Sequence, residues 1–257
     1  MRKLWLTFTA MLLCSIASFA QFGGGTGSQT DPYLISDTAQ FKAIANLGST
    51  SGIYFKLTAD IDLGDLGTVT SAIIPTTFSG TLDGDGYKIS YTVESAVSDG
   101  NSGLVGSVSG TVKNLNITAT ATITGEANNV GLLCGSLTGR IENCRALNCV
   151  VNSTIPTNNG KGIHVGTLAG YLNTSGTNGI YYCAVTGNVT GNGSVGGLVG
   201  YAEAGIIKGC SFTGSITGLP AGDHNKPDGV GGICGQASAD VDLSFCLANA
   251  TINANAN

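Results

Sequence analysis

Four cysteines recur at one place in a repeated pattern, each three residues after an isoleucine or a leucine. They are Cys144, Cys183, Cys210 and Cys246. Recurring thiols serve in disulfides, metal centres, redox sites or packing. Zinc sites typically use Cys-x-x-Cys spacing, which this pattern lacks. Thiols on adjacent strands are close enough for a disulfide, but side chains in register point the same way and rarely reach the required dihedral angle. The pattern therefore favours a ladder of buried, reduced thiols.

Cys149 departs from this ladder. It follows Cys144 by five residues, so strict alternation along a strand places it on the outward side. We expect it to be an accessible thiol or to pair with another chain. If Cys14 is removed with a leader peptide, seven cysteines remain, and an odd number excludes complete pairing within one chain.

Two acidic motifs have carboxylates spaced closely enough to be considered as calcium-binding sites. They are "ADIDLGD" (Ala59 to Asp65) and "LDGDG" (Leu82 to Gly86). A calcium loop would need more oxygen ligands, so tight turns are favoured. A glycoside hydrolase would need two carboxylates close in space. The acidic residues from Gly103 onward do not recur at one position of a repeated pattern. We therefore expect no catalytic set, cofactor or metal. These acids are Glu126, Glu142, Glu203, Asp223, Asp228, Asp240 and Asp242.

Two insertions lengthen one corner of the repeat, at Asn152 to Ile163 and at Leu219 to Gly229. Recognition often uses such loops on a rigid scaffold, although a solvated turn is the simpler interpretation. The hypothesis is a binding patch for a surface glycan or a protein. Its candidate residues are Lys161, His164, Asp223, His224, Lys226 and Asp228.

The elements that position these residues follow from an internal repeat. Five similar six-residue segments, which we call glycine words, are "NSGLVG", "VGLLCG", "VGTLAG", "VGGLVG" and "VGGICG". They end at Gly106, Gly135, Gly170, Gly200 and Gly235, in steps of 29, 35, 30 and 35 residues. Behind each word, apolar residues alternate with Thr, Ser and Asn, a period of two that indicates strands. Units of this size bury an apolar column only by stacking, and parallel crossovers are right-handed. The sequence therefore predicts an all-β fold, a right-handed parallel β-helix.

The glycine words and the first strands carry further expectations. Gly200→Val should cost roughly 1–3 kcal/mol if its corner needs a positive φ. "SDTAQFKAIANLG" predicts a short N-terminal capping helix near Thr38 to Leu47, which Ser36 or Asp37 can cap. The outward positions include many threonines, which suggests a flat face able to bind ice, interrupted in the second repeat by Leu147, Cys149 and Val151. Threonine also simply favours strands.

Residues 1–20 are typical of a signal peptide cleaved after Ala20: Arg2 and Lys3 precede an apolar run that ends in Ser18-Phe19-Ala20. This predicts a secreted or cell-surface protein. The sequence has 11 basic residues, two of them in this leader, which leaves 9 against 16 acids. Nucleic-acid binding calls for clustered Lys and Arg, so that role is not expected. We also expect no transmembrane segment after the leader.

The five Gly-x-Leu-x-Gly-like words and "FSGTLDGDGYKIS" (Phe78 to Ser90) carry a family resemblance. The chain resembles the GLUG-repeat family of bacterial secreted surface proteins, which is related to the β-helical region preceding the catalytic domain of IgA-specific metallopeptidases. The resemblance implies a β-helix from residue 21 to 257, with five GLUG-like repeats from about residue 101. Those peptidases carry His-Glu-x-x-His, and this chain does not. We therefore expect a non-enzymatic surface protein acting in adhesion or as a matrix scaffold. The alternatives are a carbohydrate-binding or polysaccharide-cleaving β-helix and an ice-binding protein.

The last residues, "FCLANATINANAN", keep the strand pattern to the end of the chain. A solenoid needs a terminal unit that covers its last rung. The pattern leaves three expectations: truncation of a longer protein, which we favour, end-to-end self-association, or a frayed last rung.

Overall fold

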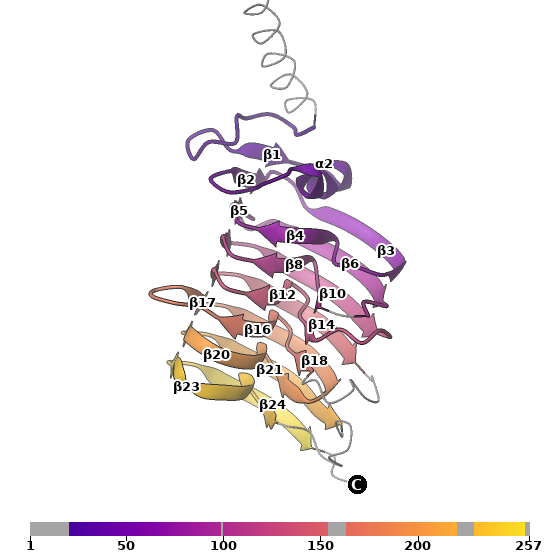
Figure 1. Cartoon of the computed structure of the whole chain (residues 1–257), viewed down its shortest axis with the longest axis vertical. Helices are drawn as coiled ribbons and strands as arrows, with labels where there is room; N and C mark the ends of the chain where they lie inside the picture. The colour runs from indigo at the N-terminus through magenta and orange to yellow at the C-terminus, as the bar shows by residue number, and fades with distance from the viewer. Residues whose placement is uncertain (1–20, 99, 154–162, 220–228, 255–257) are drawn as a thin grey trace, which may run out of the picture.

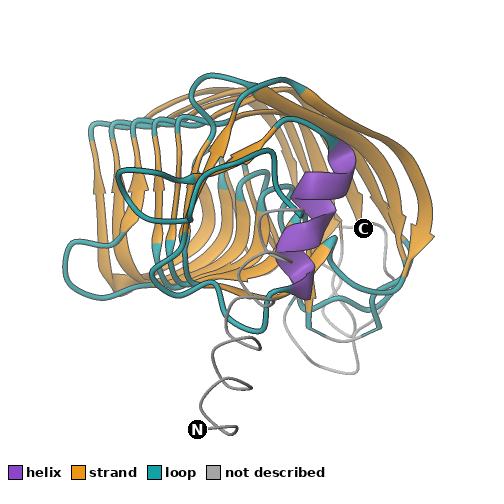
Figure 2. Ribbon diagram, turned by 90° about the horizontal axis from the view of Figure 1, so that it is seen from above, coloured by secondary structure: helices purple, strands orange, loops and turns teal. Residues whose placement is uncertain are grey.

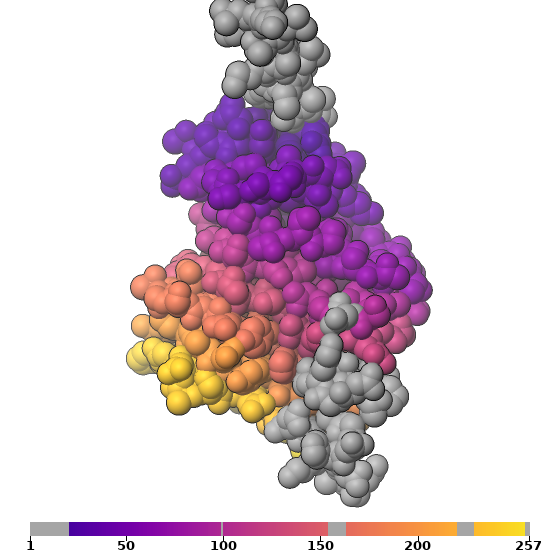
Figure 3. Space-filling model, viewed as in Figure 1, coloured from indigo at the N-terminus to yellow at the C-terminus, as the bar shows by residue number. Residues whose placement is uncertain are grey.

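A computed structural model shows the chain as a solenoid of stacked coils (Figure 1), and it describes residues 21–98, 100–153, 163–219 and 229–254. The coils follow one another in sequence order along the long axis of the molecule (Figure 3). Seen along that axis, the strands of successive coils lie over one another (Figure 2). The predicted right-handed parallel β-helix is confirmed.

Three parallel sheets form the walls of the solenoid, and all pairings between described strands are parallel. The seven-stranded sheet consists of β3 (Ile61–Val69), β6 (Lys88–Ser95), β10 (Asn116–Ile123), β14 (Arg145–Ser153), β18 (Ala184–Asn192), β21 (Ser211–Leu219) and β24 (Leu247–Ala254). The five-stranded sheet consists of β7 (Asn101–Ser102), β11 (Asn129–Val130), β15 (His164–Val165), β19 (Ser194–Gly196) and β22 (Gly229–Gly231).

The twelve-stranded sheet has two arms that meet because the long strand β20 (Val199–Lys208) turns the corner between them. One arm consists of β1 (Tyr33–Ile35), β2 (Tyr54–Leu57), β5 (Thr81–Asp83), β9 (Thr111–Lys113), β13 (Arg140–Glu142) and β17 (Gly179–Tyr181). The other consists of β4 (Ile74–Phe78), β8 (Val105–Val108), β12 (Cys134–Leu137) and β16 (Ala169–Asn173). The strand β23 (Cys234–Ser244) pairs with β20.

A helix covers the N-terminal end of the solenoid, as predicted (Figure 2). It is α2 (Thr38–Ala43), which continues into a 3-10 turn, η1 (Ile44–Asn46). Of the two expected caps, Asp37 does the capping, because its side chain accepts a 2.8 Å hydrogen bond from the backbone N–H of Gln40. Phe41 and Ile44 are fully buried, so the helix closes the apolar end of the first coil.

The core is a set of apolar columns that run along the solenoid. The leucine of each glycine word is buried from coil to coil: Leu104, Leu133, Leu168, Leu198 and Ile233. Large apolar side chains become exposed in the last coil, where Leu243, Phe245, Leu247 and Ile252 are 49%, 85%, 68% and 46% exposed. End-to-end self-association through these residues remains a prediction.

The expectation for Cys149 is wrong: its side chain is only 1% exposed. The strand β14 contains a bulge, with a register shift between Ala146 and Cys149 and a left-handed φ of 54° at Asn148. The extra residue reverses the alternation beyond it, so Cys149 and Val151 point inward and Leu147 points out. Val151 rather than Val150 therefore lies beside Ala121 in the inward column.

Candidate functional site

In the glycine words that end at Gly135, Gly170, Gly200 and Gly235, the first and the last glycine have different roles. The first makes a sharp bend: a Cβ on Gly196 would lie 1.9 Å from the carbonyl oxygen of Val199, three residues on. The last glycine lets two sheets touch: a Cβ on Gly200 would lie 2.3 Å from the backbone nitrogen of Val165. Gly200 does not adopt a positive φ, so the predicted reason for a glycine at this position is wrong. Close backbone approach requires the glycine instead.

This close approach joins the outward residues of the five-stranded sheet to those of β8, β12, β16, β20 and β23. The Asn101 side chain donates to Ser107 Oγ at 2.9 Å, and the Asn129 side chain donates to Asn101 Oδ1 at 2.8 Å. His164 Nδ1 lies 2.8 Å from Asn129 Oδ1, and Ser194 Oγ donates to Gln236 Oε1 at 2.9 Å. The result is a polar seam that follows the solenoid axis.

Three aromatic rings lie in the middle of this seam. The ring of His164, on β15, is 5.8 Å from that of Tyr171 and 5.1 Å from that of Tyr201. The two tyrosines, on β16 and β20, are 5.8 Å apart, centroid to centroid. All three side chains are half-buried. Because Asn129 Oδ1 only accepts, the contact with His164 sets the proton on Nδ1. We call His164, Tyr171 and Tyr201, with Asn129, the aromatic seam.

His164 is the one residue of the predicted binding patch that the structure describes, and it belongs to the aromatic seam. Lys161, Asp223, His224, Lys226 and Asp228 lie outside the described residues, as does the predicted signal peptide at residues 1–20. Sequence reasoning missed Tyr171 and Tyr201. Each follows the last glycine of a glycine word by one residue, a spacing that places both in one outward row.

The acidic motifs make turns. Asp62 Oδ1 accepts from the Gly64 N–H at 3.0 Å, and Asp65 Oδ1 accepts from the Gly67 N–H at 2.9 Å. Asp83 Oδ1 accepts from the Asp85 N–H at 3.0 Å. The Gly64 N–H, followed by the Ser90 hydroxyl, holds the pKa of Asp62 below its usual range. These are aspartate turns of the expected kind. Within the described ranges, no group of three or more His, Cys, Asp or Glu side chains is arranged to hold a metal ion.

The thiols in the described part of the chain are all free. Cys144, Cys183 and Cys210 are buried in one column, and Cys246 continues it, half-buried, in the last coil. The Cys210 and Cys183 thiols donate to the carbonyls of Lys208 and Tyr181, two residues before each, at 3.4 and 3.2 Å. Hydrogen bonding to Cys144 and Cys210, together with burial, raises the pKa of the Cys183 thiol.

Native thiol labelling should therefore modify Cys234 and Cys246 first, because these two are partly exposed. Cys134, Cys144, Cys149, Cys183 and Cys210 should react only when the chain unfolds. Mass spectrometry of peptides after timed alkylation measures the order. Early modification of Cys149 would contradict its inward position.

Stability should decrease as the pH rises from about 9 to 11. Burial raises the pKa of the Cys149 thiol to about 11 from the usual 9.0. A raised pKa means that the folded state prefers the protonated thiol. The contribution of Cys149 to the free energy of unfolding is therefore complete below pH 9 and is lost as the pH passes 11. Two pH units correspond to about 2–3 kcal/mol. Urea unfolding at pH 8, 9, 10 and 11 measures the slope, which Cys149→Ala should reduce; equal slopes in both proteins would reject the prediction.

Comparison with known proteins adds to this geometry. The family model described as the GLUG motif matches residues 191–217, which run from the end of β18 into β21. The chain carries a GLUG motif. The resemblance seen in the glycine words is therefore confirmed, and the word that ends at Gly200 lies within the matched motif.

Two relatives match about half of the chain. Halomucin of Haloquadratum walsbyi is 34% identical over 135 residues, 46% of this chain and 2% of halomucin. A protein of Evansella cellulosilytica, provisionally named as a Gly-rich membrane protein, is 31% identical over 160 residues, 54% of this chain and 18% of that protein. This chain thus spans a small part of both relatives.

A solved structure supports the fold. The crystal structure of a Bacteroides ovatus protein, provisionally named an immunoglobulin A1 protease, superposes with a TM-score of 0.64 and 23% identity. The match covers 90% of this chain and 70% of the other. Among the described residues, no helix is long and apolar enough to cross a membrane. The GLUG motif and the relatives are consistent with a β-helix protein of the cell surface.

Proposed function

We propose that this chain is a secreted or cell-surface β-helix that acts in adhesion by binding a ligand on the aromatic seam, without catalysis. The observation that carries the proposal is the group of three rings, His164, Tyr171 and Tyr201, joined to the amide of Asn129. Half-buried tyrosines offer a large apolar surface with a polar tip, a composition typical of recognition sites.

The seam suits a ligand that has both apolar and hydroxyl-bearing surfaces. Rings supply stacking area, and the amides and hydroxyls of Asn101, Ser107 and Asn129 supply donors and acceptors beside them. The two insertions of the chain precede β15 and β22, two strands of the same sheet. A surface glycan fits this chemistry best, and a protein ligand is the alternative.

Two carboxylates of the repeat region have partners that favour a structural role. Glu142 accepts from Arg140 Nε at 2.7 Å, and Glu203 accepts from the Asn173 side chain at 3.0 Å. A polysaccharide-cleaving β-helix is the competing hypothesis, and it would require two such groups to act on one bond. The predicted ice-binding face is broken by Leu147 at the β14 bulge, which weakens that third hypothesis.

A glycan array combined with a reducing-sugar assay tests the proposal. The full chain should bind a set of glycans and release no reducing ends. Tyr201→Ala should lower the affinity about tenfold, the effect of losing roughly 1.4 kcal/mol of stacking. Thr213→Ala, on the seven-stranded sheet, is the matched control and should bind like the wild type. Release of reducing ends, or binding that is unchanged by Tyr201→Ala, would reject the proposal. Thermal hysteresis would favour ice binding instead.

A further inference from the structure

A second feature lies on a different wall, at the corner that precedes the cysteine column. The residue before each column position has a left-handed backbone: Asn114, Asn143, Tyr182, Gly209 and Phe245, with φ of 54°, 52°, 53°, 66° and 56°. Asparagine and glycine are the residues that tolerate this conformation, whereas a bulky aromatic is an outlier there. We call this set the left-handed corner row.

Tyr182 gains little burial for its unfavourable backbone, because 57% of the side chain is exposed. Its ring lies over the next member of the row: a Cβ on Gly209 would be 2.7 Å from Tyr182 Cδ1 and 2.9 Å from Cε1. One face of the tyrosine ring thus packs against the glycine, and the other face is exposed to solvent. Residues held in such conformations at the surface concentrate at ligand sites.

The exposed ring borders a hollow that continues along the solenoid. An open hollow of about 450 Å³ is lined by Lys113, Asn114, Glu142, Asn143 and Tyr182. A second, of about 320 Å³, is lined by Asp85, Gly86, Asn114, Asn116, Asn143 and Arg145. They adjoin at the amides of Asn114 and Asn143, which are joined by a 2.8 Å hydrogen bond. Three coil steps of roughly 4.8 Å separate Asp85 from Tyr182, so the groove has the length of a short oligomer, about 14 Å.

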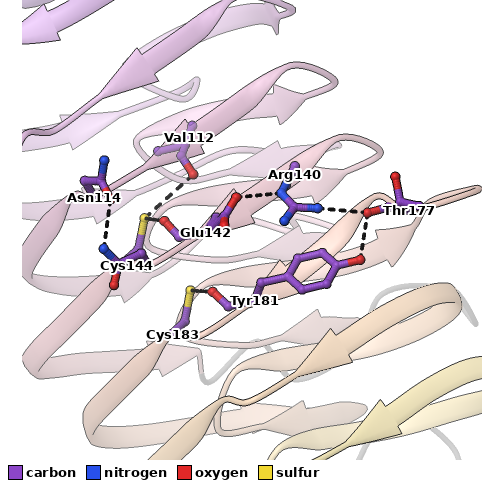
Figure 4. A network of polar contacts seen from close by, with 9 residues as sticks. Val112, Asn114, Arg140, Glu142, Cys144, Thr177, Tyr181 and Cys183 are labelled. Carbon is purple, nitrogen blue, oxygen red and sulfur yellow. Dashed lines mark hydrogen bonds and ion pairs between the residues drawn. The ribbon is translucent and has the colours of Figure 1, made fainter.

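A network of polar contacts holds two of the residues that line the hollows, Asn114 and Glu142 (Figure 4). Arg140 Nε donates to Glu142, its Nη1 donates to the Thr177 carbonyl at 3.0 Å, and its Cζ lies 3.9 Å over the Tyr181 ring. Lys113 Nζ lies 3.2 Å from Asp83, next to the Asn114 amide, which donates to the same carboxyl at 2.9 Å. Partial burial acts to raise the pKa of Asp83, but these donors outweigh it and hold that pKa below its usual range.

The charges of the groove balance. Asp85 and Glu142 are its acids, and Lys113 and Arg145 are its bases. Three of these four also have an opposite charge as an immediate neighbour, since Lys56 lies 3.0 Å from Asp85. A ligand with a high net charge would find no complementary field here. An uncharged ligand rich in hydroxyl groups would find an apolar ring and amide groups, each with hydrogen-bonding capacity left over.

We propose that the groove beside Tyr182 binds an uncharged oligosaccharide, with a sugar ring stacked on Tyr182 and its hydroxyls bound by Asn114, Asn143 and Glu142. The carbon-bound hydrogens of a pyranose form an apolar face that matches the free side of the tyrosine ring. This site is separate from the aromatic seam and does not depend on the function proposed for it.

Tyr182→Asn is the decisive variant, because asparagine is favoured at a left-handed position and occupies it in both preceding coils. The full chain and the variant are compared by calorimetry on the neutral oligosaccharides that the wild type retains on an array. The expected result is an affinity at least about tenfold lower with an equal or higher Tm. A general loss of folding would lower the Tm instead.

Phe245→Asn is the matched control, since it makes the same replacement at an exposed aromatic of the same row, outside both hollows. It should leave the affinity unchanged. Unchanged binding by Tyr182→Asn, retention of acidic glycans alone, or no retention at all would each overturn the proposal. Loss of binding in Tyr201→Ala but not in Tyr182→Asn would overturn it while supporting the aromatic seam.

Discussion

Gly200→Val is expected to lower the free energy of unfolding by roughly 3–4 kcal/mol, above the usual range for overpacking. A Cβ at this position would lie 2.3 Å from the nitrogen of Val165, 2.6 Å from the carbonyl carbon of His164 and 2.7 Å from the carbonyl oxygen of Gly170. All three are backbone atoms, which cannot rotate away as a side chain can. The five-stranded sheet would have to separate from β20, and the rings of the aromatic seam would separate with it.

Gly48→Val is the matched control, because Gly48 is exposed, does not adopt a positive φ and would have no neighbour within 4 Å of an added Cβ. Its effect should stay within about 0.5 kcal/mol. Urea unfolding followed by circular dichroism compares the two variants with the wild type. If Gly200→Val is as stable as Gly48→Val, the close approach of the two sheets is not what requires the glycine.

Phe212→Ala is expected to cost roughly 3–5 kcal/mol, the range for removing a fully buried phenyl ring. The Phe212 side chain is 0% exposed, and it fills the space left by Gly197, where a Cβ would lie 2.4 Å from the ring. Phe245→Ala is the control of the same residue type, because that ring is 85% exposed; its cost should be within about 0.5 kcal/mol. Comparable losses in the two variants would contradict the assignment of Phe212 to the core.

Regular features of this fold were predictable from sequence because they repeat. The apolar columns at Leu104, Leu133, Leu168, Leu198 and Ile233 were visible at fixed positions, and a column that recurs in each unit is buried only when the units stack. The capping helix was predictable from local signals as well, since Asp37 caps the backbone three residues away.

Single departures from the repeat were decided by the tertiary structure. The bulge at Asn148 adds one residue to one strand, and the alternating pattern of β14 does not mark where that residue is accommodated. Neighbouring strands β10 and β18 set the register on both sides, and so turned Cys149 inward. Likewise, the sequence does not show whether a glycine is needed for close backbone approach or for a positive φ. At Gly200, only the neighbouring backbone in the folded structure distinguishes these two reasons.

The candidate sites divide in the same way. His164 was identified from sequence as a titratable residue beside an insertion, but Tyr171 and Tyr201 join it from other strands, across a corner where two sheets touch. Nothing in the sequence distinguishes Tyr182 from the other aromatic residues. Its left-handed backbone and exposed ring are seen only in the folded coil. Sequence determined the stacking of the coils because burial of a repeated column depends on residue type and period. Tertiary structure decided the sites because they depend on which outward side chains meet across separate walls, and contacts of that kind have no fixed spacing along the chain.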